Sequence, residues 1–365
     1  MRAALASAAL GLLAAGGGAI ALLADAGASL RWAGGSAAAM AVFLWKAERL
    51  LAAERGRTPA PRGLRLGPAT GLTLGRGLLV CGLGGFLLPG QPDETAAAAL
   101  AWGPGVLFGL ASLLDSADGA LARRRGEVSE RGAALDTEAD AWGILLAALV
   151  LVLGGKVHPL YAATGIGFYV LRFAVRLRAA RGLPVRPVRP RPAARFTAGC
   201  TMAFSAAALL PLFGPGALIP ASLAVTAVFL AGMATDWLVV TGCADGEGRW
   251  EGPTLGRVQR LAHTVTPLLA RLALAASAAA ACASPCAGGA GAERLAAALL
   301  ALPGALGLAA RAAAMVLGVL AARLDAAGCT AFAPVAAAAV SLLLLGAGRW
   351  RIAQPEDRWL LRGRP

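Results

Sequence analysis

Four aspartates between residues 115 and 140 are the residues of this chain best suited to chemistry. Asp115 and Asp118 are three residues apart, and Asp136 and Asp140 are four residues apart. On a helix, side chains at these spacings lie on one face, about one turn from each other. Each helix would therefore offer two carboxylates to one place. Four carboxylates gathered together repel one another, so we expect cations to lie among them.

The rest of the composition favours a hard divalent cation at these aspartates. The chain has only two histidines, and its six cysteines form no C-x-x-C pair, so a structural zinc site is not favoured. Carboxylate oxygens are the ligands that Mg2+ and Mn2+ prefer. Two ions suit four carboxylates, as in metal-bridged phosphoryl transfer. We therefore expect two Mg2+ or Mn2+ ions, held by Asp115, Asp118, Asp136 and Asp140.

The elements that carry the aspartates are those of a membrane protein. Of 365 residues, 58% are hydrophobic and 15% are charged, and the mean hydropathy is +0.67. Several apolar runs approach the roughly 20 residues that cross a hydrocarbon core of about 30 Å. This composition argues against an average soluble domain and predicts an all-α, polytopic membrane helix bundle.

The apolar runs give the expected helices. A run at 3–24 is longer than most signal-peptide cores, so we expect a retained helix there. In a second run, 33–52, the second half is expected to lie along the cytoplasmic surface as an amphipathic helix. After residue 260, the runs 262–281 and 326–347 could each span, while 295–322 is either a hairpin of two short helices or lies in the interface. Between these groups lie six further runs, at 70–89, 95–114, 132–153, 159–178, 197–213 and 217–240.

Arginines alternate between the turns that join the six central runs. The turns rich in arginine are 123–131, 178–195 and 249–260. The turns that contain one lysine and no arginine are 91–94, 154–158 and 213–216. The positive-inside rule makes the first set cytoplasmic and places the aspartates at the cytoplasmic ends of their helices. The same rule accounts for the net charge of +14, so we expect no nucleic-acid partner.

The residues between the aspartates complete a longer pattern, D-x2-D-G-x2-A-R-x8-G-x3-D-x3-D. It resembles the signature of the CDP-alcohol phosphotransferases, integral membrane enzymes that move a phosphoryl-linked group from a CDP-alcohol to a second alcohol. The resemblance covers about residues 65–240 and implies a six-helix core and a homodimer. Prenyltransferases also bind Mg2+ and pyrophosphate through aspartates, but they use two motifs far apart in the chain, whereas this chain has a single cluster.

The resemblance also implies a role for each aspartate. The last of them, Asp140, would serve as the general base that takes the proton of the attacking alcohol, and it would also bind metal. The other three, Asp115, Asp118 and Asp136, would chiefly be metal ligands. The structural alternative for an isolated D-x-x-D pair is a solvated helix face, but the complete pattern argues against it.

Six further residues are expected on the donor side. A glycine one turn after Asp115 would let the donor approach the helix backbone, and an arginine in the motif would meet phosphate or a neighbouring carboxylate. Upstream, a Thr-x-x-Arg resembles the start of the family's first helix, although the family's usual asparagine is Thr70 here. The six are Thr73, Arg76, Gly119, Ala122, Arg123 and Gly132. For Arg76, a motif carboxylate and the donor phosphate are both candidate partners, and a snorkelling cytoplasmic arginine is the alternative.

Arg172 and Arg195 are candidates for binding the acceptor. In the family, basic residues in this part of the chain line the acceptor side, which suggests an anionic acceptor such as an alcohol phosphate. Positive-inside anchoring is the alternative, and it accounts for most of the neighbouring arginines. Asp236, in the sixth central run, is either a functional buried acid or a helix-end residue.

The sequence thus predicts three regions: N-terminal membrane and amphipathic helices at 1–64, a catalytic core at 65–245, and additional transmembrane helices with a basic cytoplasmic tail at 246–365. The expected function is phospholipid synthesis, by transfer of a phosphatidyl group from CDP-diacylglycerol to an alcohol with release of CMP. One alternative is a polar CDP-alcohol donor with a lipid alcohol acceptor; another is a non-enzymatic membrane scaffold or transporter. We expect the protein in a bacterial inner membrane, with its active site on the cytoplasmic side.

Overall fold

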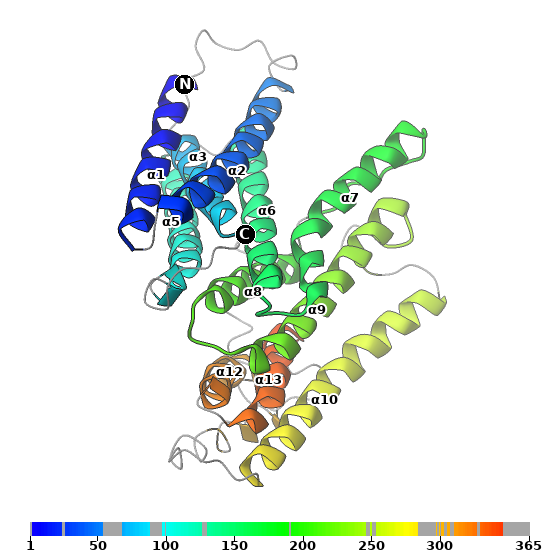
Figure 1. The fold of residues 1–365 in the computed structure, drawn as a ribbon. Helices are drawn as coiled ribbons and strands as arrows, with labels where there is room; N and C mark the ends of the chain where they lie inside the picture. Colours follow the sequence, from blue (N-terminus) through cyan, green and yellow to red (C-terminus); the bar gives the residue numbers. More distant parts are fainter. Residues whose placement is uncertain are drawn as a thin grey trace. The chain divides into compact units, whose positions relative to one another are not determined.

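The computed structural model contains helices and no strand among the residues that it describes (Figure 1). Those residues are 2–23, 26–53, 68–87, 97–98, 100–125, 130–189, 191–245, 249, 253–283, 310–326 and 329–345, with single residues and pairs between 297 and 306. In some helical stretches, including 116–125, the helix is described but its side chains are not. The prediction of an all-α polytopic bundle is confirmed.

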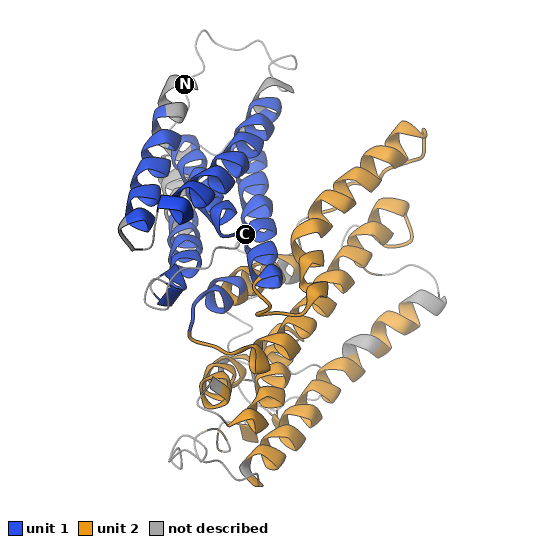
Figure 2. Cartoon of the chain, viewed as in Figure 1, with its two compact units in different colours: residues 1–153, 205–211 blue, residues 154–204, 212–365 orange. Residues whose placement is uncertain are grey.

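The chain divides into two compact units (Figure 2). The first unit comprises Met1–Leu153 and Ser205–Pro211, and the second comprises Gly154–Phe204 and Leu212–Pro365. The boundaries of these two units follow from the contacts between residues of the chain. The predicted regions 1–64, 65–245 and 246–365 follow the family resemblance instead, and they stay a prediction.

The first unit carries the aspartate motif. Its helices are α1 (Arg2–Leu23), α2 (Ala26–Ala53), α3 (Pro68–Cys81), the 3-10 helix η1 (Gly82–Leu87), α5 (Gly103–Arg125) and α6 (Glu130–Leu153). The run 70–89 therefore begins as an α-helix and tightens into a 3-10 helix. The apolar run 95–114 ends just before the first aspartate. The helix α5, which begins at Gly103, continues through the first aspartate pair to Arg125, as the helical spacing of that pair predicts.

Close helix packing in the first unit depends on glycines. A Cβ atom at Gly35 of α2 would lie 2.4 Å from the carbonyl oxygen of Gly84 in η1, so the two backbones touch where neither residue has a side chain. About two turns further along α2, the fully buried ring of Phe43 fills the space beside Gly77 of α3. The second half of α2 therefore packs within the first unit.

The second unit contains the remaining helices. They are η2 (Pro159–Tyr161), α7 (Ala162–Ala180), α8 (Pro192–Leu209, of which Ser205 onward belongs to the first unit), α9 (Pro215–Thr241), α10 (Pro253–Ala283), α12 (Ala310–Ala326), η3 (Thr330–Phe332) and α13 (Ala333–Leu345). Glycine in the left-handed conformation ends α9, with φ 87° at Gly242. The C-terminal helices share a core of Leu274, Leu317, Phe332 and Leu342.

In the part of the chain that the structure describes, four helical segments are long and apolar enough to cross a membrane: Thr70–Leu87, Pro159–Ala180, Pro215–Thr241 and Gly256–Ala281. Shorter apolar helices lie at Ala9–Ala21, Gly103–Asp115 and Thr330–Leu345. The apolar part of α6 begins only after Asp140, because its first half carries the acidic residues. These helices support an integral membrane protein whose acidic motif lies at the ends of apolar segments.

Candidate active site

Three helices of the first unit bring the functional side chains together. Asp115 lies on α5, while Asp136 and Asp140 lie one turn apart on α6 and share a face. The helix α3 packs against both α5 and α6 and carries Arg76. Residues that are far apart in the chain therefore converge on one point.

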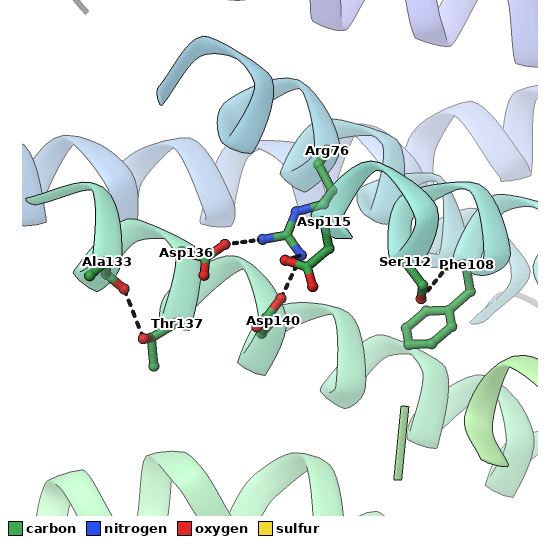
Figure 3. A network of polar contacts seen from close by, with 8 residues as sticks. All are labelled: Arg76, Phe108, Ser112, Asp115, Ala133, Asp136, Thr137 and Asp140. Atoms are coloured by element: carbon green, nitrogen blue, oxygen red, sulfur yellow. Dashed lines mark hydrogen bonds and ion pairs between the residues drawn. The ribbon is translucent and has the colours of Figure 1, made fainter. Parts of the chain in front are cut away.

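The guanidinium of Arg76 lies at the centre of this cluster (Figure 3). Its Nη1 atom is 2.6 Å from Asp140 Oδ1 and 2.9 Å from Asp115 Oδ1, and its Nη2 atom donates to Asp136 Oδ1. Of the partners considered for this arginine, the structure shows the motif carboxylates. With only 4% of its side chain exposed, Arg76 does not snorkel to a surface.

The aspartates are more open than the arginine beneath them. The exposed fraction is 35% for the Asp115 side chain, 41% for Asp136 and 29% for Asp140. The buried guanidinium holds one oxygen of each carboxylate from the inner side. The outer side of the cluster is left accessible to an ion or a phosphorylated ligand.

The three described aspartates fit a divalent cation. Asp115, Asp136 and Asp140 each offer an oxygen, and these oxygens lie within 4.8 Å of one another. Three carboxylates and one guanidinium leave a local charge of about minus two, which an ion such as Mg2+ or Mn2+ neutralises. The fourth predicted ligand, Asp118, lies on α5 three residues after Asp115, and its side chain is outside the described part.

The hydroxyl groups beside the aspartates have local partners (Figure 3). Ser112 donates to the carbonyl oxygen of Phe108 at 2.9 Å, and Thr137 donates to that of Ala133 at 2.8 Å. Both hydroxyls therefore bond to the backbone of their own helix.

The other residues predicted on the donor side divide into two groups. Thr73 is buried on α3 one turn before Arg76, and Gly132 lies in the first turns of α6, one turn before Asp136. Both are thus within a turn of residues of the cluster. The other three, Gly119, Ala122 and Arg123, lie in the last turns of α5, where the structure describes the helix but not the surroundings of its residues.

Sequence reasoning missed one ion pair beside the cluster. Lys46 Nζ of α2 lies 2.9 Å from Glu138 Oε1 of α6 and 4.8 Å from the ring centre of Trp142. The available signal was Glu138 itself, an acid between two predicted ligands at the start of an apolar run, which requires a cation when buried. Lys46 is one of only two lysines in the chain.

The predicted acceptor residues belong to the second unit. Arg172 of α7 is half-buried, with its guanidinium carbon 5.2 Å from the ring centre of Phe168, and Arg195 of α8 is exposed. Asp236 of α9 forms an ion pair with Arg191, so it is not merely a helix-end residue. The acceptor role of Arg172 and Arg195 stays a prediction.

Comparison with known proteins gives a match to one family. Residues 68–234 match the model of the CDP-alcohol phosphatidyltransferase family. No curated protein and no solved structure matches the chain. The matched range begins at the first residue of α3, includes all four aspartates, and ends within α9. It leaves out α1 and α2, and also everything after residue 234.

Proposed function

We propose that the chain is a member of the CDP-alcohol phosphatidyltransferase family, whose model matches residues 68–234, and that it transfers the phosphatidyl group of CDP-diacylglycerol to an alcohol, with release of CMP. As a member of this family it is an integral membrane enzyme of phospholipid synthesis that acts on a CDP-alcohol and an alcohol acceptor. The observation that carries the proposal is the convergence of three motif aspartates on one open, oxygen-rich site.

In the proposed reaction, the acceptor hydroxyl attacks the phosphorus that carries diacylglycerol. A new bond forms between the acceptor oxygen and this phosphorus, and the bond from the phosphorus to the oxygen bridging to CMP breaks. The electron pair of that bond leaves with CMP. The hydroxyl proton passes to Asp140, which acts as general base.

We propose Asp115, Asp118, Asp136 and Asp140 as the ligands of two Mg2+ or Mn2+ ions. Bound ions supply charge neutralisation for the pyrophosphate and for the leaving CMP. With such ions bound, the aspartates would hold the donor, and Asp140 would also take the proton of the acceptor.

The residues around the aspartates are proposed to shape the donor site. Thr73, Gly119, Ala122, Arg123 and Gly132 keep their predicted roles on the donor side. Arg76 acts on the donor through the aspartates, because its guanidinium contacts three of them from the buried side.

Arg172 and Arg195 would favour an acceptor that carries a phosphate. The arginine-rich turns favour an active site on the cytoplasmic side of a bacterial inner membrane. A homodimer is the assembly that the family resemblance implies.

The test is CMP release by the purified, folded protein. CDP-diacylglycerol and Mg2+ or Mn2+ are supplied with glycerol phosphate, serine or inositol phosphate, and a second arm pairs polar CDP-alcohols with diacylglycerol. We expect release in the first arm, its loss with EDTA, and its return with added metal. Release only in the second arm would reverse the donor and the acceptor. No release in either arm would overturn the enzymatic proposal.

A further inference from the structure

We propose that Lys46 of α2 is a positioning residue of the active site, which fixes the orientation of α6 by pairing with Glu138. The helix α2 lies outside the range that matches the family, residues 68–234. The inference rests on the proposed function, because it takes Asp136 and Asp140 to be metal ligands.

The helix α6 has two opposite faces that carry charge. Asp136 and Asp140, four residues apart, share the face that meets Arg76. Glu138 is two residues from each of them, about half a turn away, so it points to the opposite face. Trp142 follows Glu138 by four residues and lies on that same opposite face.

Lys46 contacts both residues of this opposite face. Its Nζ atom is 2.9 Å from Glu138 Oε1 and 4.8 Å from the ring centre of Trp142. The Glu138 side chain is only 5% exposed, and a buried carboxylate is costly unless a cation balances it. A rotation of α6 about its axis would break this contact, so the pair resists such a rotation.

The helix α2 is itself fixed to the helix that carries Arg76. Phe43, three residues before Lys46, is fully buried against Gly77, the residue that follows Arg76. Earlier in α2, the backbones of Gly35 and Gly84 touch. Lys46 is thus held at a defined place beside α6.

Three contacts therefore join α2, α3 and α6 to one another, and these three helices form a frame that supports the metal-binding face. Phe43 joins α2 to α3, Arg76 joins α3 to α6, and Lys46 joins α2 to α6. Within this frame, a small rotation of α6 would move Asp136 and Asp140 relative to Asp115. Residues that do not bind the metal themselves but orient its ligands commonly affect metal affinity by fixing the positions of those ligands.

The test compares four variants of the full-length protein in detergent: Lys46→Met, Lys46→Arg, Glu138→Gln and Lys156→Met. Mn2+ affinity is measured by electron paramagnetic resonance, with kcat and KM for CDP-diacylglycerol and the thermal unfolding midpoint beside it. Lys156→Met is the matched control, since it removes the other lysine, which lies in the second unit.

We expect Lys46→Met and Glu138→Gln to weaken Mn2+ binding by about tenfold, the lower end of the effect of outer-shell partners. Lys46→Arg should keep the affinity within about twofold of wild type, because an arginine can make the same ion pair. Lys156→Met should bind Mn2+ like wild type.

A lower unfolding midpoint in Lys46→Met with unchanged Mn2+ affinity would overturn the inference, because the pair would then be structural only. If Lys46→Met does not fold, Glu138→Gln decides, because its amide has the shape of the carboxylate but lacks the charge that pairs with Lys46. Unchanged Mn2+ affinity in folded Glu138→Gln would then overturn the inference. Wild-type protein that binds no Mn2+ would instead remove the metal site, and with it both the proposed function and this inference.

Discussion

Arg76 holds the three described aspartates of the candidate metal site in one place. Removing the arginine would leave Asp115, Asp136 and Asp140 facing one another without the cation that the structure places among them. We expect Arg76→Met to destabilise the metal-free protein by about 1.5–3 kcal/mol, the range for a hydrogen bond to a charged group, because the carboxylates left behind are partly exposed. Thermal unfolding in EDTA measures this loss.

Arg76→Lys is the informative companion to that variant. Lysine keeps the charge but lacks the planar fork with which Nη1 and Nη2 reach different aspartates. We expect a midpoint between those of wild type and Arg76→Met. Equal midpoints for all three proteins in EDTA would contradict a holding role for this arginine.

The aspartates are expected to differ in what they do. Asp140→Asn should lower kcat by at least a hundredfold while CDP-diacylglycerol still binds, because the amide keeps an oxygen but cannot accept the proton. Asp118→Asn should weaken metal dependence and donor binding together. Rates of CMP release and donor-binding isotherms measure the two effects, and equal donor affinity in both variants would refute the division of roles.

At the scale of the elements, spacing within a helix was predictable and pairing between helices was not. The three- and four-residue spacings predicted that the aspartates of each pair share a face, and Asp136 and Asp140 do so on α6. The partner of Arg76 was left open between carboxylate and phosphate, because the aspartates it contacts lie on other helices. Lys46 and Glu138 are 92 residues apart, and no local pattern connects them.

The ends of the helices and their close packing were also harder to predict than the spacing within a helix. Hydropathy located the apolar part of α5 but not its continuation to Arg125, because a helix continues through polar residues once its backbone hydrogen bonds are formed. The packing of α2 against α3 and η1 depends on glycines that match residues far along the chain, which composition alone does not reveal.

The contact between α2 and η1 predicts opposite effects at two neighbouring glycines. At Gly35 an added Cβ atom would meet the backbone of Gly84 at 2.4 Å, whereas at Gly34 nothing lies within 4 Å. We expect Gly35→Ala to destabilise the protein by about 1–3 kcal/mol through overpacking. Gly34→Ala should be neutral or stabilising by up to about 1 kcal/mol, from helix propensity. Thermal unfolding of the pair checks this, and a loss of stability equal in both would contradict the close contact.

At the scale of the whole molecule, the side of the membrane on which the site lies remains a proposal, and single thiols can test it. Cys243 is a free, exposed thiol just after α9, next to the arginine-rich turn 249–260. Lys156 lies in the turn 154–158, which contains no arginine. The positive-inside rule puts these two turns on opposite sides, with Cys243 on the side of the aspartates.

We therefore expect a membrane-impermeant maleimide to label Cys243 in inside-out vesicles but not in intact spheroplasts. A Lys156→Cys variant that also carries Cys243→Ser should show the reverse pattern, because its thiol would face the other compartment. The chain has five other cysteines, so the Cys243→Ser protein alone gives the background labelling. Labelling of Cys243 from the outside would place the arginine-rich turns, and the aspartates with them, on the outer surface, and a cytoplasmic supply of CDP-linked donor would then no longer reach the site.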